Sequence, residues 1–422
     1  MKNTNKEDEE IKISTKHMPL RIVLFVLALA AAGTAFAIFF TSLNEKSAGY
    51  QRITATPKKE APAYQLSVEA MYYLDGKSSD INAKIGELQT VLSENLFTIY
   101  ATLDEYGSYN THSSIGDLNK HIGQEVQVSE LLYTTLKKAY DYSDSYSNYS
   151  IYAQPIYDFW DNITHLDAES RVNQDVVNYP DNQTYLNGLL TYCCKEHCTV
   201  SFLEGNKIKV ELSNEYRTFI EENQVESPVL SLNILKVPLM VEYVKNVFEE
   251  RGYKNGYLFT PDDYSVNLSG HKKLEHIFYV DQPETSSYLV GLKTMYEGGH
   301  TGYSSLRFHT YAEDGIYNFK KDDVTYYRHL NLNLTSGLPN QLISNLVVIK
   351  GDEEKIDELA LKANELNKDE NLEDLYTRLT SNEFTGSAFI VSNNKDDKIA
   401  ISSSIFEKTT IAQSIAERVI QK

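Results

Sequence analysis

The sequence predicts an α+β domain of helices and mixed, mainly antiparallel sheets, behind one N-terminal transmembrane helix. Helix-like and strand-like stretches follow one another without the regular alternation that a doubly wound sheet requires. One apolar run of 19 residues is long enough to cross a bilayer as a helix. The chain has 422 residues and a formal net charge of −19, so we expect no nucleic-acid partner, because binding phosphates needs a basic surface.

The N-terminal region is predicted to tether the protein to a membrane. Residues 22–42 form the anchor, and the basic residues in 1–21 favour a cytoplasmic tail, which places the main domain outside the cell membrane as a single-pass protein. A cleaved signal peptide ending near Ala37 is the competing interpretation. The long polar leader favours the uncleaved anchor. Residues 43–64 read as a linker, and residues 65–422 as the folded domain.

Apolar residues at three- and four-residue spacing predict the helices. The first runs from Ile81 to Leu103, and Ser129 can cap the second. Pro238 can open a third helix, which ends near Arg251. Further helices are predicted over 353–366, 371–381 and 405–421.

Alternating polar and apolar residues predict the strands. They are expected over 207–213, 256–260, 276–280, 305–311, 325–335 and 342–349, with a closing hairpin of 386–392 and 398–404. Within the stretch from His329 to Pro339, Leu330, Leu332 and Leu334 would share one face. The opposite, polar face is either a solvated sheet surface or part of a ligand site.

The three cysteines of the chain lie together as Cys193, Cys194 and Cys198, beside His197. The usual two-residue spacing of paired metal ligands is absent, and there is no second cysteine cluster. The pattern therefore favours a local disulfide, such as Cys194–Cys198, with one free thiol over a metal site.

Several stretches resemble, in order, the ApbE family of FAD:protein FMN transferases. These are "SSIGDLN" (113–119), the segment 128–160 with Pro155 and Trp160, "VLSLNILKVPLMVEYVKNVFEERGY" (229–253), "YYRHLNLNLTSGLP" (326–339) and "KIDELALKANEL" (355–366). Members of this family split FAD with Mg2+ and attach FMN to Ser or Thr of a target protein, usually outside the cytoplasmic membrane. The resemblance implies an extracytoplasmic flavin transferase that uses FAD and Mg2+ and has a flavin-acceptor protein as its partner.

The resemblance also implies roles for single residues. His329 would be catalytic and would bind the cofactor together with Lys236, Thr335 and Ser150. Asp357 would hold Mg2+, with the backbone carbonyl of Asn233 as a second ligand. Taken alone, Lys236 reads as a surface lysine, Asp357 as a solvated helix residue and His329 as a filler of the sheet edge.

The chain departs from the family pattern where that pattern has polar groups. The family acids fall on Ser150 and Leu230, and the threonine that shares Mg2+ with the helix acid falls on Leu361. Two alternatives therefore stand beside the transferase. One is a catalytically inactive pseudoenzyme that acts as a flavin-binding or accessory module, and the other is a cell-surface interaction protein that uses the tyrosine-rich residues 140–157.

Overall fold

The structure, a computed structural model, describes residues 47–260, 264–270, 273–282, 287–297, 302–307, 316–350, 355–396 and 398–422. The chain forms two compact units, of which Tyr50–Tyr73 with Ile85–Lys422 is the larger and Met1–Gly49 with Leu74–Lys84 the smaller. The predicted tail and anchor, 1–21 and 22–42, lie outside the described residues. Within the described residues, no helix combines the length and the apolar character needed to cross a membrane.

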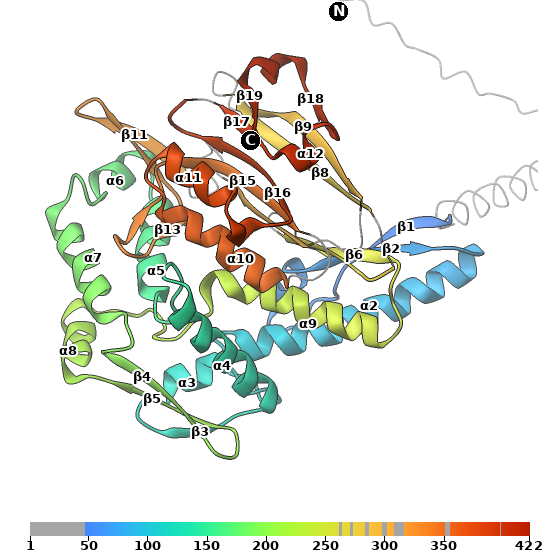
Figure 1. The fold of residues 1–422 in the computed structure, drawn as a ribbon. Coiled ribbons are helices and arrows are strands. Elements are labelled where there is room, and N and C mark those ends of the chain that lie inside the picture. Colours follow the sequence, from blue (N-terminus) through green and yellow to red (C-terminus); the bar gives the residue numbers. More distant parts are fainter. Residues whose placement is uncertain are drawn as a thin grey trace, which may run out of the picture. The chain divides into compact units, whose positions relative to one another are not determined.

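A nine-stranded sheet organises the larger unit, in the order β1-β2-β6-β7-β10-β15-β16-β17-β19 (Figure 1). Every pairing from β2 to β17 is antiparallel, and β17 and β19 pair in parallel. The prediction of a mainly antiparallel α+β fold is therefore confirmed. The strands are β1 (Gly49–Ile53), β2 (Glu69–Leu74), β6 (Gly256–Phe259), β7 (Tyr264–Asn267), β10 (Gly302–Arg307), β15 (Ile343–Lys350), β16 (Ser387–Asn393), β17 (Ile399–Ile401) and β19 (Val419–Gln421).

Both faces of the central strands are covered, which explains their almost continuous apolar sequences. Val347 and Ile349 of β15 join a buried cluster with Leu292 of β9. That strand belongs to a second sheet of β8 (Lys273–Gln282), β9 (Ser287–Glu297) and β18 (Thr409–Ile411). Helix α10 (Ile356–Glu365) packs against β10 and β15, as Figure 1 shows.

The remaining helices and small sheets complete the fold. Ser129 caps α4 by accepting a hydrogen bond from the Leu132 amide, as its sequence position predicts. The helices are α2 (Ser78–Leu103), α3 (Ile115–Lys120), α4 (Glu130–Ser145), α5 (Gln154–Thr164), α6 (Ala168–Asn173), α7 (Pro180–Tyr192), α8 (Asn214–Asn223), α9 (Lys236–Glu250), α11 (Leu372–Leu379) and α12 (Ser403–Phe406). The short 3-10 helices are η1 (Pro62–Leu66), η2 (Asn233–Leu235), η4 (Leu366–Lys368), η5 (Asn382–Phe384) and η6 (Gln413–Arg418). A three-stranded sheet comprises β3 (Glu125–Gln127), β5 (Lys207–Leu212) and β4 (Cys198–Leu203), and two hairpins comprise β11 (Tyr317–Lys321) with β12 (Val324–Arg328) and β13 (Leu332–Asn333) with β14 (Leu338–Pro339).

The strand predicted over 325–335 is wrong beyond Arg328. The chain instead makes the tight hairpin β13–β14, in which the Asn333 side chain accepts a hydrogen bond from the Thr335 amide and Gly337 has φ of +69°. A side chain that closes its own turn competes with an extended strand. As a result Leu330 is 38% exposed while Leu332 is fully buried, so these leucines do not share one face.

The helix predicted over 405–421 is also wrong. Within this segment lie the end of α12, strand β18, η6 and strand β19. Each of the two strands pairs with a strand distant in sequence, β18 with β9 and β19 with β17. Pairing with these partners outweighs the local helical pattern.

The described part of the predicted linker is built into the fold. Ile53 of β1 and Tyr64 of η1 are almost completely buried, and the Tyr64 hydroxyl donates a hydrogen bond to the Thr56 carbonyl. An apolar side chain buried in this way stabilises the segment by roughly 1.5–3 kcal/mol. Residues 49–66 therefore behave as an edge of the domain.

Candidate functional site

The segment that resembles the central family motif is held by hydrogen bonds to two other segments of the resemblance. The Asn119 side chain bonds both the amide and the carbonyl of Leu230, at 2.9 Å each. The Ser231 amide donates to the Ile151 carbonyl at 2.9 Å, and the Asn233 side-chain amide donates to the Ser150 carbonyl at 2.8 Å. The structure thus brings the predicted site residues Ser150 and Asn233 together. The backbone of Asn233 is left-handed, with φ of +49°.

A cavity of about 530 Å³, here called the α5 cavity, opens beside this segment. Three residues that the family motifs pointed to, Asn233, Ile234 and Leu330, form part of its wall. The described residues of its wall include no lysine or arginine, and its polar lining is acidic, tyrosine-rich and amide-bearing: Glu105, Asp158, Asp161, Tyr106, Tyr157, Tyr264, Gln154, Asn233 and Asn331. The size suits a small ligand, and the charge favours one that is not an anion.

Lys236 forms an ion pair with Glu105, so its charge is already neutralised within the protein. Its ammonium lies 2.8 Å from the Glu105 carboxylate and 5.0 Å from the centre of the Tyr100 ring. The side chains of Lys236 and Glu105 are only 19% and 10% exposed, so the pair is weakly screened. A phosphate at Lys236 would have to share the ammonium with Glu105.

His329 is buried behind the β13–β14 hairpin. Its Nε2 lies 2.8 Å from the Asn340 carbonyl and its Nδ1 accepts a hydrogen bond from the Asn331 amide at 3.2 Å. Since a carbonyl can only accept, Nε2 carries the proton and the ring is neutral. Burial lowers the pKa of His329 to about 3. This placement favours a structural role over the predicted catalytic and cofactor-binding roles.

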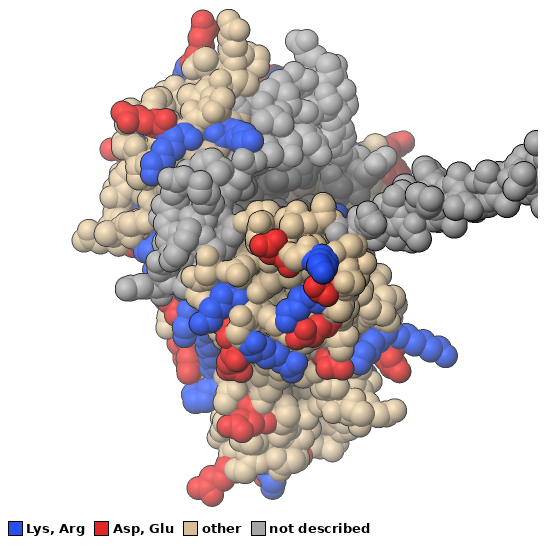
Figure 2. Space-filling view, turned by 90° about the vertical axis from the view of Figure 1, so that its right-hand side faces the viewer, with Lys and Arg blue, Asp and Glu red and all other residues tan. Residues whose placement is uncertain are grey.

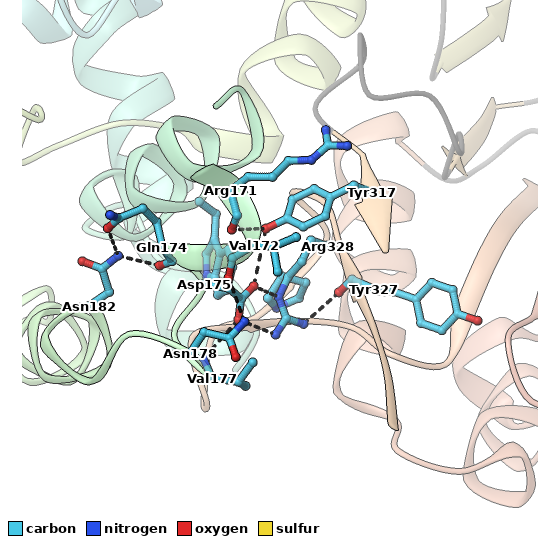
Figure 3. Close-up of polar contacts among 12 residues, drawn as sticks. Arg171, Val172, Gln174, Asp175, Val177, Asn178, Asn182, Tyr317, Tyr327 and Arg328 are labelled. Carbon is cyan, nitrogen blue, oxygen red and sulfur yellow. Dashed lines mark hydrogen bonds and ion pairs between the residues drawn. The ribbon is translucent and has the colours of Figure 1, made fainter. Parts of the chain in front are cut away.

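The neighbouring Arg328, the last residue of β12, anchors the β11–β12 hairpin to the α6–α7 region, as Figure 3 shows. Its guanidinium donates two hydrogen bonds to Asp175, and the Tyr317 hydroxyl lies 3.4 Å from the same carboxylate. The Trp160 indole donates to the Gly337 carbonyl at 2.6 Å, with the Arg328 guanidinium 5.2 Å from its ring. This cluster fixes the position of the hairpin.

Thr335 is exposed on the turn between β13 and β14, and its amide bonds the Asn333 side chain at 3.0 Å. Its neighbour Leu334 lines a second cavity of about 260 Å³, together with Ser150 and Cys194. Ser150 lines this second cavity and not the α5 cavity. Its backbone carbonyl contacts the α5 cavity wall through the hydrogen bond from Asn233. The cofactor role of Thr335 stays a prediction.

Asp357 is fully buried and forms an ion pair with Lys138 of α4. The Tyr142 hydroxyl lies 3.3 Å from the same oxygen, Oδ2, and Oδ1 accepts the Glu358 amide at 3.0 Å. Leu361, one helical turn further on, is fully buried as well. Helix α10 packs against η2 and α9, so the elements that carry Asp357, Asn233 and Lys236 are neighbours, but these side chains bond different partners.

These residues do not fit Mg2+. The ion prefers about six oxygens in octahedral order. Here the one buried carboxylate already faces an ammonium, and the position four residues on offers a leucine. Among the residues with described placement, no group of three His, Cys, Asp or Glu side chains has the arrangement of a metal site.

The cysteine prediction needs correction, because all three thiols are free. Cys193 is buried with its sulfur 3.4 Å from the Tyr216 hydroxyl, while Cys194 points to the Thr191 carbonyl at 3.3 Å. Cys198 is buried at the start of strand β4. The sulfur atoms are thus directed to separate neighbours by the helix end and the strand start.

Sequence reasoning missed the two residues that decide the state of the site, Lys138 and Glu105. Lys138 lies 219 positions from Asp357, and Glu105 lies 131 positions from Lys236. No local pattern marks either residue, because an ion pair between distant positions leaves no periodic signal. On the face shown in Figure 2, basic and acidic side chains are likewise mixed.

Comparison with solved structures identifies the fold of the chain. The ApbE protein of Thermotoga maritima matches with a TM-score of 0.52 at 12% identity, over 87% of this chain and 99% of that protein. The flavin transferase ApbE of Vibrio cholerae matches with a TM-score of 0.52 at 15% identity, over 85% of this chain and 98% of its own. A mutant of that enzyme gives 0.51 at 15% identity, over 88% and 100%.

Family models and curated protein sequences give no match to the chain. Identities of 12–15% show a shared fold and leave the activity open. The structural likeness spans most of the chain, and it confirms the relationship that the motif order predicts. The chain is therefore a divergent protein with the fold of the ApbE flavin transferases.

Proposed function

We propose that this protein is a non-catalytic relative of the flavin transferases, a module that binds a ligand in the α5 cavity without transferring FMN. The charge of that cavity carries the proposal. Among the described residues its wall includes three carboxylates, of which Glu105 is paired with Lys236, and no lysine or arginine, whereas the pyrophosphate of FAD is an anion. The tyrosines and carboxylates suit a neutral or positively charged ligand better than a pyrophosphate.

The lack of fitting polar groups for phosphoryl transfer supports the same conclusion. Such a reaction needs a metal or fixed donors where charge develops on the phosphoryl oxygens. In this chain Lys236 is bonded to Glu105, and Asp357 to Lys138. Transfer of FMN would require both ion pairs to open.

A second candidate is the family activity itself, transfer of FMN from FAD to Ser or Thr of an acceptor protein with Mg2+. The observation in its favour is that Asn233, Ile234 and Leu330, which lie in two of the family's motifs, line one cavity of about 530 Å³. This candidate includes a flavin-acceptor partner. The non-catalytic proposal requires none.

One titration separates the candidates. The full chain is purified in detergent and titrated with FAD, with and without Mg2+, while release of AMP is followed by chromatography. We expect no AMP release above the protein-free rate under either condition. Metal-dependent AMP release would overturn the proposal in favour of the transferase.

FAD binding without AMP release would indicate a retained flavin site in a non-catalytic module, and its loss in a cavity variant would contradict the charge argument for the α5 cavity. If FAD does not bind, the protein is either a module for another ligand or a cell-surface interaction protein. A Val237→Trp variant, which fills the cavity wall, tests the location, since it should abolish any binding that occurs there.

We also propose that the module is held outside the cell membrane by residues 22–42. Support comes from the length of the apolar run and from the basic residues before it. Protease added to intact cells should remove the C-terminal domain and leave a short membrane-bound fragment. A domain that stays protected until the cells are lysed would contradict this orientation.

A further inference from the structure

We infer that the ammonium of Lys138 takes the place at Asp357 that a divalent cation takes in the flavin transferases. The family resemblance assigns the helix acid to Mg2+, and the structure pairs that same acid with a lysine from another helix. The inference concerns how the negative charge of the Asp357 carboxylate is neutralised, and it does not depend on the ligand of the α5 cavity. It can therefore stand or fall independently of the proposed function.

Both carboxylate oxygens of Asp357 already have protein partners. Oδ2 faces the Lys138 ammonium and the Tyr142 hydroxyl, and Oδ1 accepts the Glu358 amide. The carboxylate has no exposed surface, while the Lys138 side chain is 33% exposed. The lysine thus reaches a fully buried carboxylate while part of its own side chain stays in contact with solvent.

The chemistry of a buried carboxylate explains why a cation is needed there. Burying an isolated charge is very unfavourable, so buried acids are paired or bound to metals. A lysine supplies one positive charge and three hydrogen-bond donors. The Lys138 ammonium also lies 5.5 Å from the centre of the Tyr142 ring, whose hydroxyl bonds the same acid.

The loss of the second family ligand agrees with this exchange. Leu361 stands four residues after Asp357, on the same face of α10, and it is fully buried. A leucine is tolerated beside an acid that is neutralised by Lys138. It could not complete the oxygen shell of a metal.

The consequence is a connection between α4 and α10 that needs no metal. Lys138 and Asp357 are separated by 219 positions and join the first half of the domain to its C-terminal part. We expect the unfolding temperature of the wild-type chain to be the same in EDTA, in millimolar MgCl2 and in millimolar MnCl2. In addition, Mn2+ binding measured by water-proton relaxation should be the same for the wild-type chain and for the Asp357→Asn variant.

A pair of variants isolates Lys138. Leu361→Thr restores the family hydroxyl but keeps the lysine, and Lys138→Ala/Leu361→Thr also removes the ammonium. We expect no Mn2+ response from the first variant and a rise of about 2–4 °C in unfolding temperature with millimolar MnCl2 from the second. Lys137→Ala/Leu361→Thr is the matched control, since Lys137 pairs with Asp141 on the surface.

Two results would overturn the inference. One is a wild-type Mn2+ site that Asp357→Asn abolishes, because metal and lysine would then coexist. The other is a folded Lys138→Ala/Leu361→Thr variant without any Mn2+ response, which would make the pair an ordinary ion pair. If that variant does not fold, the wild-type measurement alone decides.

Discussion

Arg328 donates two hydrogen bonds to Asp175 across 153 positions of sequence, from Nε at 2.5 Å and from Nη2 at 2.9 Å. Both side chains are buried, at 2% and 0% exposure. Removing one partner of such a pair leaves an uncompensated buried charge. The pair therefore holds the β11–β12 hairpin, and with it His329, against the α6–α7 region.

We expect Arg328→Met to lower the free energy of unfolding by about 3–5 kcal/mol. Urea unfolding followed by circular dichroism measures the change. The control is Lys137→Met, which removes an exposed ion pair and should cost less than about 0.5 kcal/mol. Equal losses of unfolding free energy in the two variants would show that the buried ion pair contributes no more to stability than the exposed one.

The pH dependence of stability should report the buried, neutral His329. Its pKa in the folded chain is about 3, below the ordinary value of 6.5, so unfolding takes up a proton between these two pH values. The stability from this group is complete above about pH 6.5 and falls by about 1.4 kcal/mol per pH unit below it, until the pH reaches the folded-state pKa.

Urea unfolding of wild type and His329→Gln between pH 5 and pH 7 tests this prediction. The wild-type curve should fall more steeply toward pH 5 than the variant curve. His165→Gln is the control, because His165 is 54% exposed. Parallel curves for wild type and His329→Gln would mean that His329 gains a proton in the folded protein, as a catalytic histidine could.

Reaction of the thiols should follow their burial. Burial raises the pKa of Cys193 to about 12 and also raises that of Cys198, whereas Cys194 is partly exposed. At pH 8 we expect one fast-reacting thiol per folded chain with a disulfide reagent. The Cys194→Ser variant should lose this reaction, and Cys193→Ser should keep it.

The same assay checks the free state of the cysteines. After unfolding in guanidinium without reductant, all three thiols should react, as the structure has them. A single reactive thiol in the unfolded chain would instead reveal a disulfide. The assay is run on protein purified without reductant, so that any native disulfide is preserved.

The charge of the α5 cavity can be changed at Glu105. Glu105→Gln removes one carboxylate from the wall and releases Lys236 from its ion pair. We expect the affinity for an anionic nucleotide such as ADP to rise about 5- to 10-fold, as follows from roughly 1 kcal/mol of favourable electrostatics. Isothermal titration calorimetry measures the change.

The matched control is Glu125→Gln, which removes a carboxylate from an exposed ion pair with Lys207. It should leave ADP binding unchanged, since exposed charges are screened by salt. An unchanged affinity in Glu105→Gln as well would show that cavity charge does not limit anion binding. In that case the argument against a pyrophosphate ligand would lose its main support.

The periodicity of the sequence was sufficient for several of the elements. Apolar spacing predicts α2, α10 and α11, and alternation predicts β5 and the β16–β17 hairpin. Ser129 marks the start of α4 because capping depends on residues close in sequence. The order of the family-like motifs was enough to predict the fold, which the solved structures confirm.

The same local reasoning fails where distant segments decide the structure. Residues 405–421 have a helical pattern, yet β18 and β19 form because β9 and β17 offer partners. The alternating leucines after His329 predict a strand, yet the Asn333 side chain and Gly337 turn the chain back. Local preferences of this kind are small compared with tertiary pairing and packing.

By itself, the sequence determined the fold class and part of the helices and strands, and it gave a prediction of the site residues. Only the tertiary structure decided what those residues bond: Asp357 to Lys138, Lys236 to Glu105, and His329 to Asn331 and Asn340. Helix and strand patterns arise from neighbours in the chain, so they can be read from spacing. The partner of a buried charge is chosen by packing between segments far apart in the chain, and spacing carries no record of that choice.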